Sequence, residues 1–230
     1  MYLKTPSPFS CCSLFFILTI TLGRGLFAFE VKPAPEGILL KPEGAATGTL
    51  PPGWSPYFAG RGNPGTWEVK TDGDKKVFAQ VSTHGFGLHF DSLVFENAAY
   101  QDMELKVKIK AVSGARDQGG GLVWRFQDRN NYYVARINPL EGNFRLYKMV
   151  QGKRKILANA EVSLSQNQWY LLTIKMKGDR IEGYLGDVKC FEIIDETFSQ
   201  PGKIGFWTKA DAVTYFDDFF VTPLNTEEAK

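Results

Sequence analysis

Residues 103–112 alternate strictly between apolar and charged side chains, and this pattern constrains the fold more than any other feature of the sequence. Apolar residues take every second position, and the positions between them are Glu104, Lys106, Lys108 and Lys110. Successive side chains of a strand point to opposite faces, whereas a helical period of 3.6 would mix the two sets. The segment therefore predicts a strand with one buried face and one solvated face, as antiparallel sheets have.

Seven further segments are predicted to be strands, because apolar and aromatic residues recur in them between turn-forming residues: 121–127, 132–138, 143–150, 169–177, 180–185, 203–208 and 214–221. The sequence shows no helix longer than a turn or two, no internal repeat and no glycine-rich phosphate loop. Many short strands together with 14% aromatic residues are typical of two packed sheets. The expected fold is all-β, a two-sheet antiparallel β-sandwich, with an up-and-down barrel as the alternative.

The first 28 residues are expected to be a signal peptide, cleaved after Ala28. Lys4 precedes an apolar run at 11–22 that is free of charge. As a helix these residues would span about 18 Å, which is too short for a hydrocarbon core of about 30 Å, so an uncleaved anchor is the alternative. The protein is therefore expected to be exported to a bacterial periplasm or the extracellular space, without membrane contact after cleavage.

Three further segments follow the predicted signal peptide. Residues 29–53 form a leader rich in proline and glycine, residues 54–222 form the folded domain, and residues 223–230 form a polar tail. Cys190 is the only cysteine after the predicted signal peptide. A single cysteine excludes an intrachain disulfide and a cysteine-based zinc cluster in the mature chain. Beyond residue 28 the basic and acidic residues balance, and this balance argues against a nucleic-acid partner.

Several short motifs occur in a fixed order along the domain. They are GGLVWRFQD at 120–128, NNYYV at 130–134, a tryptophan at 169, GKIG at 202–205 and FDDF at 216–219. This series resembles the concanavalin A-like lectin/glucanase superfamily, specifically its laminin-G-like jelly rolls, and within it the exported bacterial domains related to the 3-keto-disaccharide hydrolase family. The resemblance covers residues 54–222 and implies a jelly roll, a fold that carries lectins, glycosidases and adhesion modules alike.

Candidate catalytic groups do not fall into a recognisable arrangement. Glu192 and Asp195 would lie on opposite faces of a strand, and Glu192 and Glu196 would lie about 13 Å apart, too far for a glycosidase pair. Of the motif that 3-keto-disaccharide hydrolases carry, only Gly121 and Arg125 are present here. The expected function is therefore binding without catalysis, and a hydrolase or lyase acting on a 3-keto-glycoside is the alternative.

Alternation along three successive strands predicts a binding surface on the outer, concave side of one sheet. The outward positions are Arg125, Gln127, Tyr132, Arg136, Asn138, Arg145 and Tyr147. Guanidinium forks can hydrogen-bond sugar hydroxyls or acidic groups, and aromatic rings can cover the apolar side of a sugar. The expected partner is a carbohydrate or another component of the cell envelope. A solvated face without a ligand is the alternative, and a β-bulge would shift the alternation by one residue.

Other polar and aromatic residues carry weaker expectations. The resemblance implies a possible structural calcium ion, held by Asp217 or Asp218, but not by both, together with carbonyl groups of residues 60–65. His84 and His89 are expected on opposite sides of an extended segment. Four tryptophans are interpreted as core residues rather than sugar platforms: Trp54, Trp67, Trp169 and Trp207.

Overall fold

The computed structural model describes residues 36–224. The predicted signal peptide, the start of the leader and the end of the polar tail lie outside this range. Fifteen strands and no helix occur in the described residues, so the predicted all-β class is confirmed. Accordingly, no helix of residues 36–224 has the length and apolar character needed to cross a membrane.

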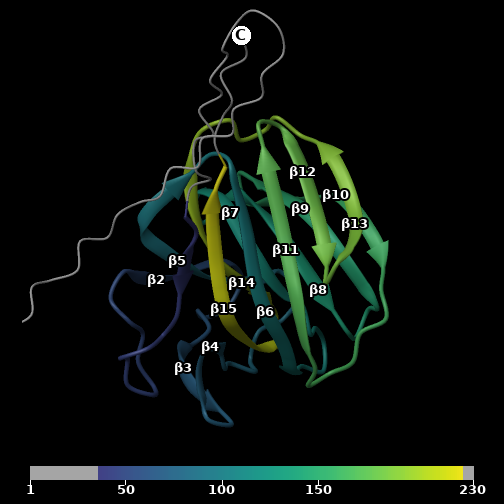
Figure 1. Cartoon of the computed structure of the whole chain (residues 1–230). Helices are drawn as coiled ribbons and strands as arrows, with labels where there is room; N and C mark the ends of the chain where they lie inside the picture. The colour runs from purple at the N-terminus through teal and green to yellow at the C-terminus, as the bar shows by residue number, and fades with distance from the viewer. Residues whose placement is uncertain (1–35, 225–230) are drawn as a thin grey trace, which may run out of the picture. The chain divides into compact units, whose positions relative to one another are not determined.

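The strands form two antiparallel sheets packed face to face (Figure 1). The eight-stranded sheet runs, in spatial order, through β13 (Val188–Ile194), β12 (Arg180–Leu185), β11 (Trp169–Lys177), β6 (Met103–Ser113), β15 (Val213–Pro223), β4 (Lys75–Gln80) and β3 (Trp67–Asp72), with β1 (Ile38–Leu40) paired to β15. The seven-stranded sheet runs through β10 (Lys153–Glu161), β9 (Asn143–Val150), β8 (Asn131–Asn138), β7 (Gly120–Asp128), β14 (Gly202–Lys209), β5 (His89–Tyr100) and β2 (Trp54–Gly60). The predicted β-sandwich is confirmed.

The main core lies between the two sheets and is rich in aromatic rings. The ring of Phe206 stacks on Trp54 at 5.2 Å and on Phe216 at 4.5 Å between centroids. Around them lie buried aliphatic residues of both sheets, among them Leu105, Val107 and Ile109 of the alternating segment. Large rings suit this position because each fills much of the gap of about 10 Å between packed sheets.

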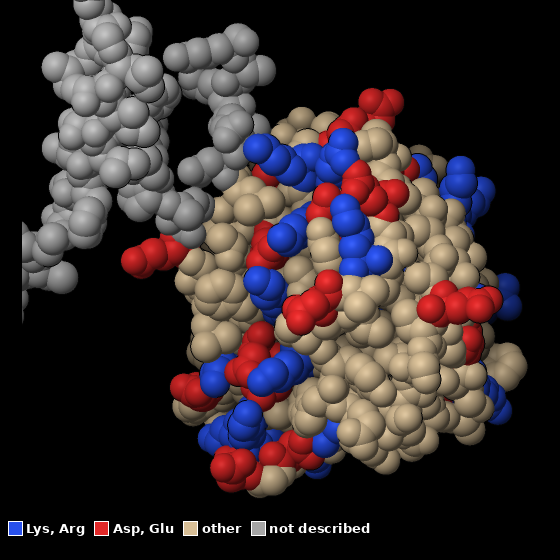
Figure 2. Space-filling model, turned by 45° about the vertical axis from the view of Figure 1, so that its right-hand side comes forward, with Lys and Arg blue, Asp and Glu red and all other residues tan. Residues whose placement is uncertain are grey.

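The outer face of the eight-stranded sheet is charged. Glu104 pairs with Lys106 and, at 2.8 Å, with Lys175, and Lys108 pairs with Asp218 at 2.8 Å. Basic and acidic side chains consequently lie next to one another in Figure 2. The lysines predicted to solvate β6 occupy this face, which keeps the sheet surface in water without a net excess of either charge.

The outer face of the seven-stranded sheet differs because it carries a second apolar cluster. Its members come from β5, β7, β8, β9 and β14: Phe90, Val94, Val123, Phe126, Tyr132, Val134, Tyr147, Met149 and Trp207, with Tyr57 of β2 packed beside them. All nine are buried although they point away from the core between the sheets. Long side chains on this face therefore cover the rings, and these side chains form the candidate site.

Candidate functional site

Strands β8 and β9 place their side chains as the alternation predicts. Tyr133, Ala135 and Ile137 enter the core between the sheets. Tyr132 and Tyr147 belong to the outer cluster, and Val134 is paired directly with Tyr147 across the two strands. Five of the seven predicted site residues therefore share the outer face of the sheet: Tyr132, Arg136, Asn138, Arg145 and Tyr147.

Arg136 is the centre of a hydrogen-bond network at one end of this face. Its guanidinium donates to Asn143 Oδ1 at 2.6 Å, to Glu141 Oε2 at 2.8 Å and to the hydroxyl of Tyr147 at 3.2 Å. Arg145 donates to the same Glu141 oxygen at 2.8 Å and to Asn159 Oδ1 at 2.6 Å. The Arg136 side chain is only 1% exposed, so its charge is compensated inside the protein.

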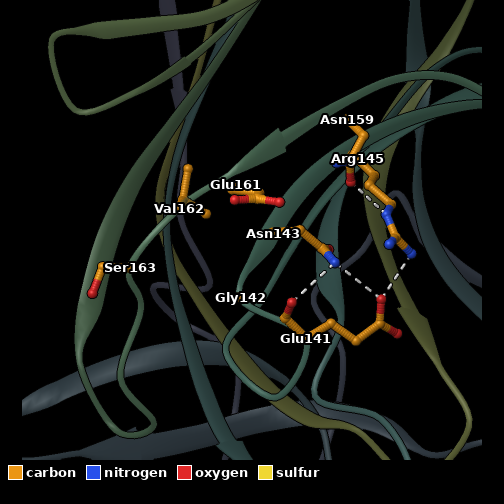
Figure 3. A pocket seen from close by; sticks show the side chains of 8 residues that line it. All are labelled: Glu141, Gly142, Asn143, Arg145, Asn159, Glu161, Val162 and Ser163. Carbon is orange, nitrogen blue, oxygen red and sulfur yellow. Dashed lines mark hydrogen bonds and ion pairs between the residues drawn. The ribbon is translucent and has the colours of Figure 1, made fainter.

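A hollow of about 550 Å³ opens beside this network (Figure 3). Glu141, Asn143 and Arg145 line one side, and Asn159 and Glu161 of β10 contribute to the lining. Burial raises the pKa of Glu141, but the neighbouring Arg136 and hydrogen bonds from Asn143 outweigh this effect, so its pKa is lowered. Glu141 is therefore ionised at neutral pH, which suits an acceptor better than a general acid.

Asn138 takes part in a second network at the same end of the sheet. It donates to Asp117 Oδ1 at 3.0 Å, and the same oxygen accepts the backbone N–H of Gly119 at 2.7 Å. The other oxygen of Asp117 accepts from Lys209. The Asp117 side chain is fully buried, and its charge is balanced by these donors.

Arg125 does not lie on the outer face, contrary to the sequence prediction. The pairing of β7 with β14 shifts after Val123, where one extra residue is inserted into β7, and Arg125 adopts a left-handed backbone conformation with φ of 44°. Its side chain donates to the carbonyl oxygen of Gly178 at 2.7 Å and to Asp102 Oδ1 at 3.3 Å. A β-bulge reverses the alternation beyond it, which explains the error.

The bulge also changes the two residues that follow. Phe126, which unbroken alternation would place in the core between the sheets with Trp124, stacks on Tyr132 in the outer cluster at 5.4 Å between ring centroids. Gln127 is exposed and donates to the carbonyl oxygen of Pro201 at 3.0 Å. Gln127 therefore contacts the segment just before β14 and does not join the Arg136 network. Arg125 and Gln127 are thus the two predicted site residues that the structure does not place at the site.

Sequence reasoning missed Arg154, which the structure places over the aromatic cluster. The centre of its guanidinium lies 4.4 Å from the ring centroid of Tyr147, 5.1 Å from that of Phe90 and 6.0 Å from that of Trp207. Burial is the main cause that lowers its pKa. Strand β10 was not predicted, because a bulge between Ile156 and Ala158 interrupts its alternation, so this residue had no predicted face.

Trp207 was predicted as core, and it is buried, but in the outer cluster rather than between the sheets. Its Nε1 donates to the hydroxyl of Tyr132 at 3.3 Å. Burial raises the pKa of Tyr132 to about 12, so this hydroxyl stays protonated. Alternation could have placed Trp207 correctly, because Ile204 and Phe206 of the same strand point into the core and Trp207 follows on the opposite side.

The two aspartates considered for calcium are engaged with lysines. Asp218 pairs with Lys108 at 2.8 Å and with Lys41 at 3.2 Å, and Asp217 Oδ2 lies 3.7 Å from Lys75. Among residues 36–224 no group of three or more acidic, histidine or cysteine side chains could hold a metal ion. This donor set does not fit a hard cation, which needs several free oxygens, so calcium stays a prediction that these contacts do not favour.

The two histidines lie together instead of on opposite sides. Residues 81–88 form a loop rather than a continuous strand, and the rings of His84 and His89 meet edge to face at 5.9 Å. His89 is buried and bonds Asp91 at 2.8 Å, and both histidines line a hollow of about 540 Å³ with Phe86. Gly85 and Gly87 were the sequence signal that could have indicated this loop, because glycines two residues apart are typical of turns.

The acidic passage near β13 serves the fold. Glu192 pairs with Arg180 and Lys189. Asp195 accepts from the hydroxyl of Tyr133 and from Lys148, each at 2.6 Å. These carboxylates are held by separate partners and do not face one another as a catalytic pair, which agrees with the sequence interpretation.

Solved structures with the same fold include proteins of several kinds. The carbohydrate-binding module CBM66 of Bacillus subtilis is 22% identical, with a TM-score of 0.60 over 74% of this chain and 95% of that one. A β-glucanase of Bacillus licheniformis is 10% identical, with a TM-score of 0.54 over 82% of this chain and 98% of that one. A protein of Bacillus subtilis with a galectin-like fold is also 10% identical, with a TM-score of 0.54 over 75% and 90%. These likenesses confirm the jelly-roll fold.

No curated protein matches the chain. Residues 49–222, which include every strand except β1 and the last residue of β15, match the model of one domain family. That family is described as the 3-keto-alpha-glucoside-1,2-lyase-like domain, in agreement with the resemblance seen in the sequence. Because the match covers most of the chain, this protein belongs to the family of 3-keto-alpha-glucoside-1,2-lyase-like domains.

Proposed function

We propose that the protein binds a saccharide on the outer face of the seven-stranded sheet. The surface concerned, here named the Arg/Tyr face, consists of the partly exposed Arg145 and Arg154 and of the buried residues that lie beneath and beside them: Tyr132, Arg136, Asn138, Tyr147 and Trp207. The observation that carries the proposal is the packing of the Arg154 guanidinium over Tyr147, Phe90 and Trp207. Family membership and the carbohydrate-binding module that shares the fold support it.

The chemistry of this surface suits sugar hydroxyl groups. Arg145 and Arg154 are partly exposed and carry planar donors, and the buried rings beneath Arg154 hold its guanidinium in place. Such donors lose little conformational freedom when they form hydrogen bonds, because the fork is already oriented. Asn159 and Glu161 at the rim of the neighbouring hollow offer additional polar groups.

The ionisation of the carboxylates near this face favours binding of a saccharide over its cleavage. Both carboxylates that point into the Arg/Tyr face, those of Glu141 and Asp117, are balanced by several donors. A general acid needs a raised pKa, and that of Glu141 is lowered. The members of the Arg/Tyr face that a ligand can reach are therefore guanidinium donors, and the exposed carboxylate of Glu161 lies beside them in the hollow.

Cleavage of a glycoside is the second candidate, and one observation favours it besides the family match. Glu161 lies in the same hollow as Glu141 and is exposed, and Figure 3 shows its side chain extending toward Asn143. A free carboxylate opposite an ionised one is the minimum that such chemistry requires. Incubation with 3-keto-glucosides tests this: turnover that Glu161→Gln abolishes would establish an enzyme.

Export is part of the proposal and depends on residues 1–28, which lie outside the described range. Cell fractionation combined with intact-mass measurement tests it. A mature protein that begins at residue 29 in the periplasm or the medium would support export, and a full-length cytoplasmic protein would contradict it.

Saccharide binding is tested by a glycan array followed by calorimetry with the purified chain. Arg145→Ala removes an accessible donor, and we expect it to weaken binding about tenfold, as loss of a charged hydrogen bond does. Arg129→Ala is the matched control, because Arg129 is exposed in the turn between β7 and β8. Equal affinities of the wild type, Arg145→Ala and Arg154→Ala would contradict the proposed surface.

A further inference from the structure

Arg154 is a partly buried cation without a carboxylate partner. None of the ion pairs formed within residues 36–224 includes this residue, and its Nη1 atom is buried without a hydrogen-bond acceptor. Burying a guanidinium in this way is unfavourable unless another group compensates its charge. Three aromatic rings supply part of that compensation through cation–π contacts, but none of them is a hydrogen-bond acceptor in the plane of the guanidinium.

The other cations of the Arg/Tyr face are paired. Arg136 and Arg145 share the carboxylate of Glu141, each at 2.8 Å. Two guanidinium groups thus face one carboxylate, so this pairing leaves a positive excess.

Lys209 and Asp117 form the remaining pair and add no net charge. Burial is the main cause that lowers the pKa of Arg154, and the positive charge of Arg136 lowers it further. Arg136 is therefore close enough to Arg154 for the two cations to repel each other. With the exposed carboxylate of Glu161 in the hollow included, four basic side chains (Arg136, Arg145, Arg154 and Lys209) face three carboxylates (Glu141, Asp117 and Glu161), which leaves an excess of one positive charge. The chain beyond residue 28 is balanced overall. A local excess of this kind attracts an anionic ligand.

Guanidinium geometry narrows the chemical class of that ligand. A carboxylate matches the planar fork of arginine with two parallel hydrogen bonds, and this match gives directional specificity as well as attraction. The rings of Tyr147 and Phe90 pack against one side of the Arg154 guanidinium. A ligand must therefore approach this guanidinium from the side that the rings do not cover.

We infer that the Arg/Tyr face prefers a saccharide that carries a carboxylate, such as a uronic acid unit, and that Arg154 binds this carboxylate. The inference rests on the proposed function and deepens it by naming the class of sugar. The hydroxyl groups of the same sugar reach the donors of Arg145 and Asn159 at the rim of the hollow.

Paired ligands test the inference. Calorimetry at low ionic strength compares oligosaccharides of glucose with oligosaccharides of glucuronate of the same linkage and length, and adds a sulfated glucose oligomer as a third arm. We expect the uronate to bind about tenfold more tightly than the neutral sugar, as one bidentate charged contact provides. We expect the sulfated oligomer to bind less tightly than the uronate, because a sulfate ester is a weaker hydrogen-bond acceptor than a carboxylate, although the guanidinium fork can contact two oxygens of either group.

Two substitutions at one position separate charge from geometry. Arg154→Gln should abolish the preference for the uronate, because it should weaken binding of the uronate about tenfold more than binding of the neutral sugar. Arg154→Lys keeps the charge without the fork, so it should retain only part of the preference. Arg129→Gln, which removes an exposed charge elsewhere, should change nothing, and circular dichroism of each variant checks that the fold is intact.

The results test the preference for an acidic sugar separately from saccharide binding itself. Equal binding of neutral and acidic sugars, a preference that survives in Arg154→Gln, or tighter binding of the sulfated oligomer would overturn the inference while leaving saccharide binding in place. Failure of every sugar to bind would overturn the proposed function and the inference with it.

Discussion

Arg125 donates a hydrogen bond to Asp102, with 3.3 Å between Nη2 and Oδ1, and the two side chains are only 2% and 4% exposed. Arg125 belongs to β7 of the seven-stranded sheet, whereas Asp102 lies in the turn that leads into β6 of the other sheet. Asp102 also accepts the backbone N–H of Gly178, at 2.9 Å, from the turn between β11 and β12. The pair therefore joins three chain segments at one end of the sandwich.

Replacing Asp102 with alanine should lower the free energy of unfolding by about 3 kcal/mol, because the buried guanidinium of Arg125 would lose its counter-charge. The backbone carbonyl groups of Gln101, Phe198 and Gly178 still accept from Arg125, so the loss should lie at the lower end of the range for buried pairs. Urea unfolding of the wild type and the variant measures the difference.

Asp179→Ala is the control for this substitution. Asp179 is exposed in the neighbouring turn, and its removal should change the free energy of unfolding by less than about 0.5 kcal/mol. Equal stabilities of the two variants would mean that Arg125 does not depend on Asp102.

Asp195 should make stability depend on pH in the acid range. Burial raises its pKa, but hydrogen bonds from Lys148, Thr197 and Tyr133 outweigh this and bring the pKa down to about 2. An unfolded aspartate has a pKa of about 3.9, so the unfolded chain takes up the proton first. The contribution of the ionised form, about 2 kcal/mol, is therefore complete above pH 4 to 5 and is lost as the pH falls toward 2.

Urea unfolding of the wild type and Asp195→Asn between pH 2 and pH 6 tests this dependence. The variant should be less stable at pH 6, and the difference should shrink steadily below pH 4. Glu196→Gln serves as control, because Glu196 is the exposed neighbour in the sequence. A stability difference that is constant over this pH range would contradict the assignment.

The fold could be predicted from the sequence wherever alternation was unbroken. The eight predicted strands agree with β6, β7, β8, β9, β11, β12, β14 and β15 to within two residues at each end. The other seven strands, β1 to β5, β10 and β13, were not among the predicted segments. In β10 a bulge disrupts the alternation. The loop at 81–88 was mistaken for extended structure although Gly85 and Gly87 mark a turn, and Gly87 adopts a positive φ of 63°.

The candidate site was predictable to the same extent, and for the same reason. Tyr132 and Tyr147 were placed correctly because β8 and β9 are regular over their whole length. Arg125 was misplaced because a bulge inserts one residue, and a bulge depends on the pairing with β14 rather than on the sequence of β7 alone. Arg154 was missed because its role depends on contacts with rings from three other strands, which no local pattern reveals.

Thr214→Val should stabilise the protein by about 1 kcal/mol. The side chain of Thr214 is buried in the core, and its hydroxyl has no hydrogen-bond partner among the described residues. Gln80, which is paired with Thr214 across β4 and β15, has a buried side-chain amide that also makes no hydrogen bond among the described residues. An unsatisfied buried hydroxyl costs about 1 to 3 kcal/mol, and valine removes it while preserving the shape.

Differential scanning calorimetry of Thr214→Val and Thr214→Ser separates the two parts of this side chain. Serine keeps the hydroxyl and loses the methyl group, so that variant should be destabilised by about 1 kcal/mol. A decrease in stability for Thr214→Val would show that the hydroxyl has a partner in solution.

Glu141→Gln should lower the free energy of unfolding by about 1 to 2 kcal/mol at neutral pH. This difference from the wild type should become smaller at low pH. The substitution removes the carboxylate shared by Arg136 and Arg145, and Arg136 is buried, but Asn143 and Tyr147 still accept from it, which limits the loss. The side chain of Glu141 is 33% exposed, so solvent screens part of the interaction.

The lowered pKa of Glu141 determines how this difference varies with pH. Its ionised form contributes fully at neutral pH and progressively less as the pH falls below about 4.5, through the lowered pKa of the folded state. Glu161→Gln is the matched control, because Glu161 lines the same hollow and is exposed (Figure 3), so it should leave stability unchanged within about 0.5 kcal/mol. Thermal unfolding of both variants at pH 7 and pH 3.5 measures the effect, and equal losses in the two variants would mean that Glu141 does not compensate the buried arginine.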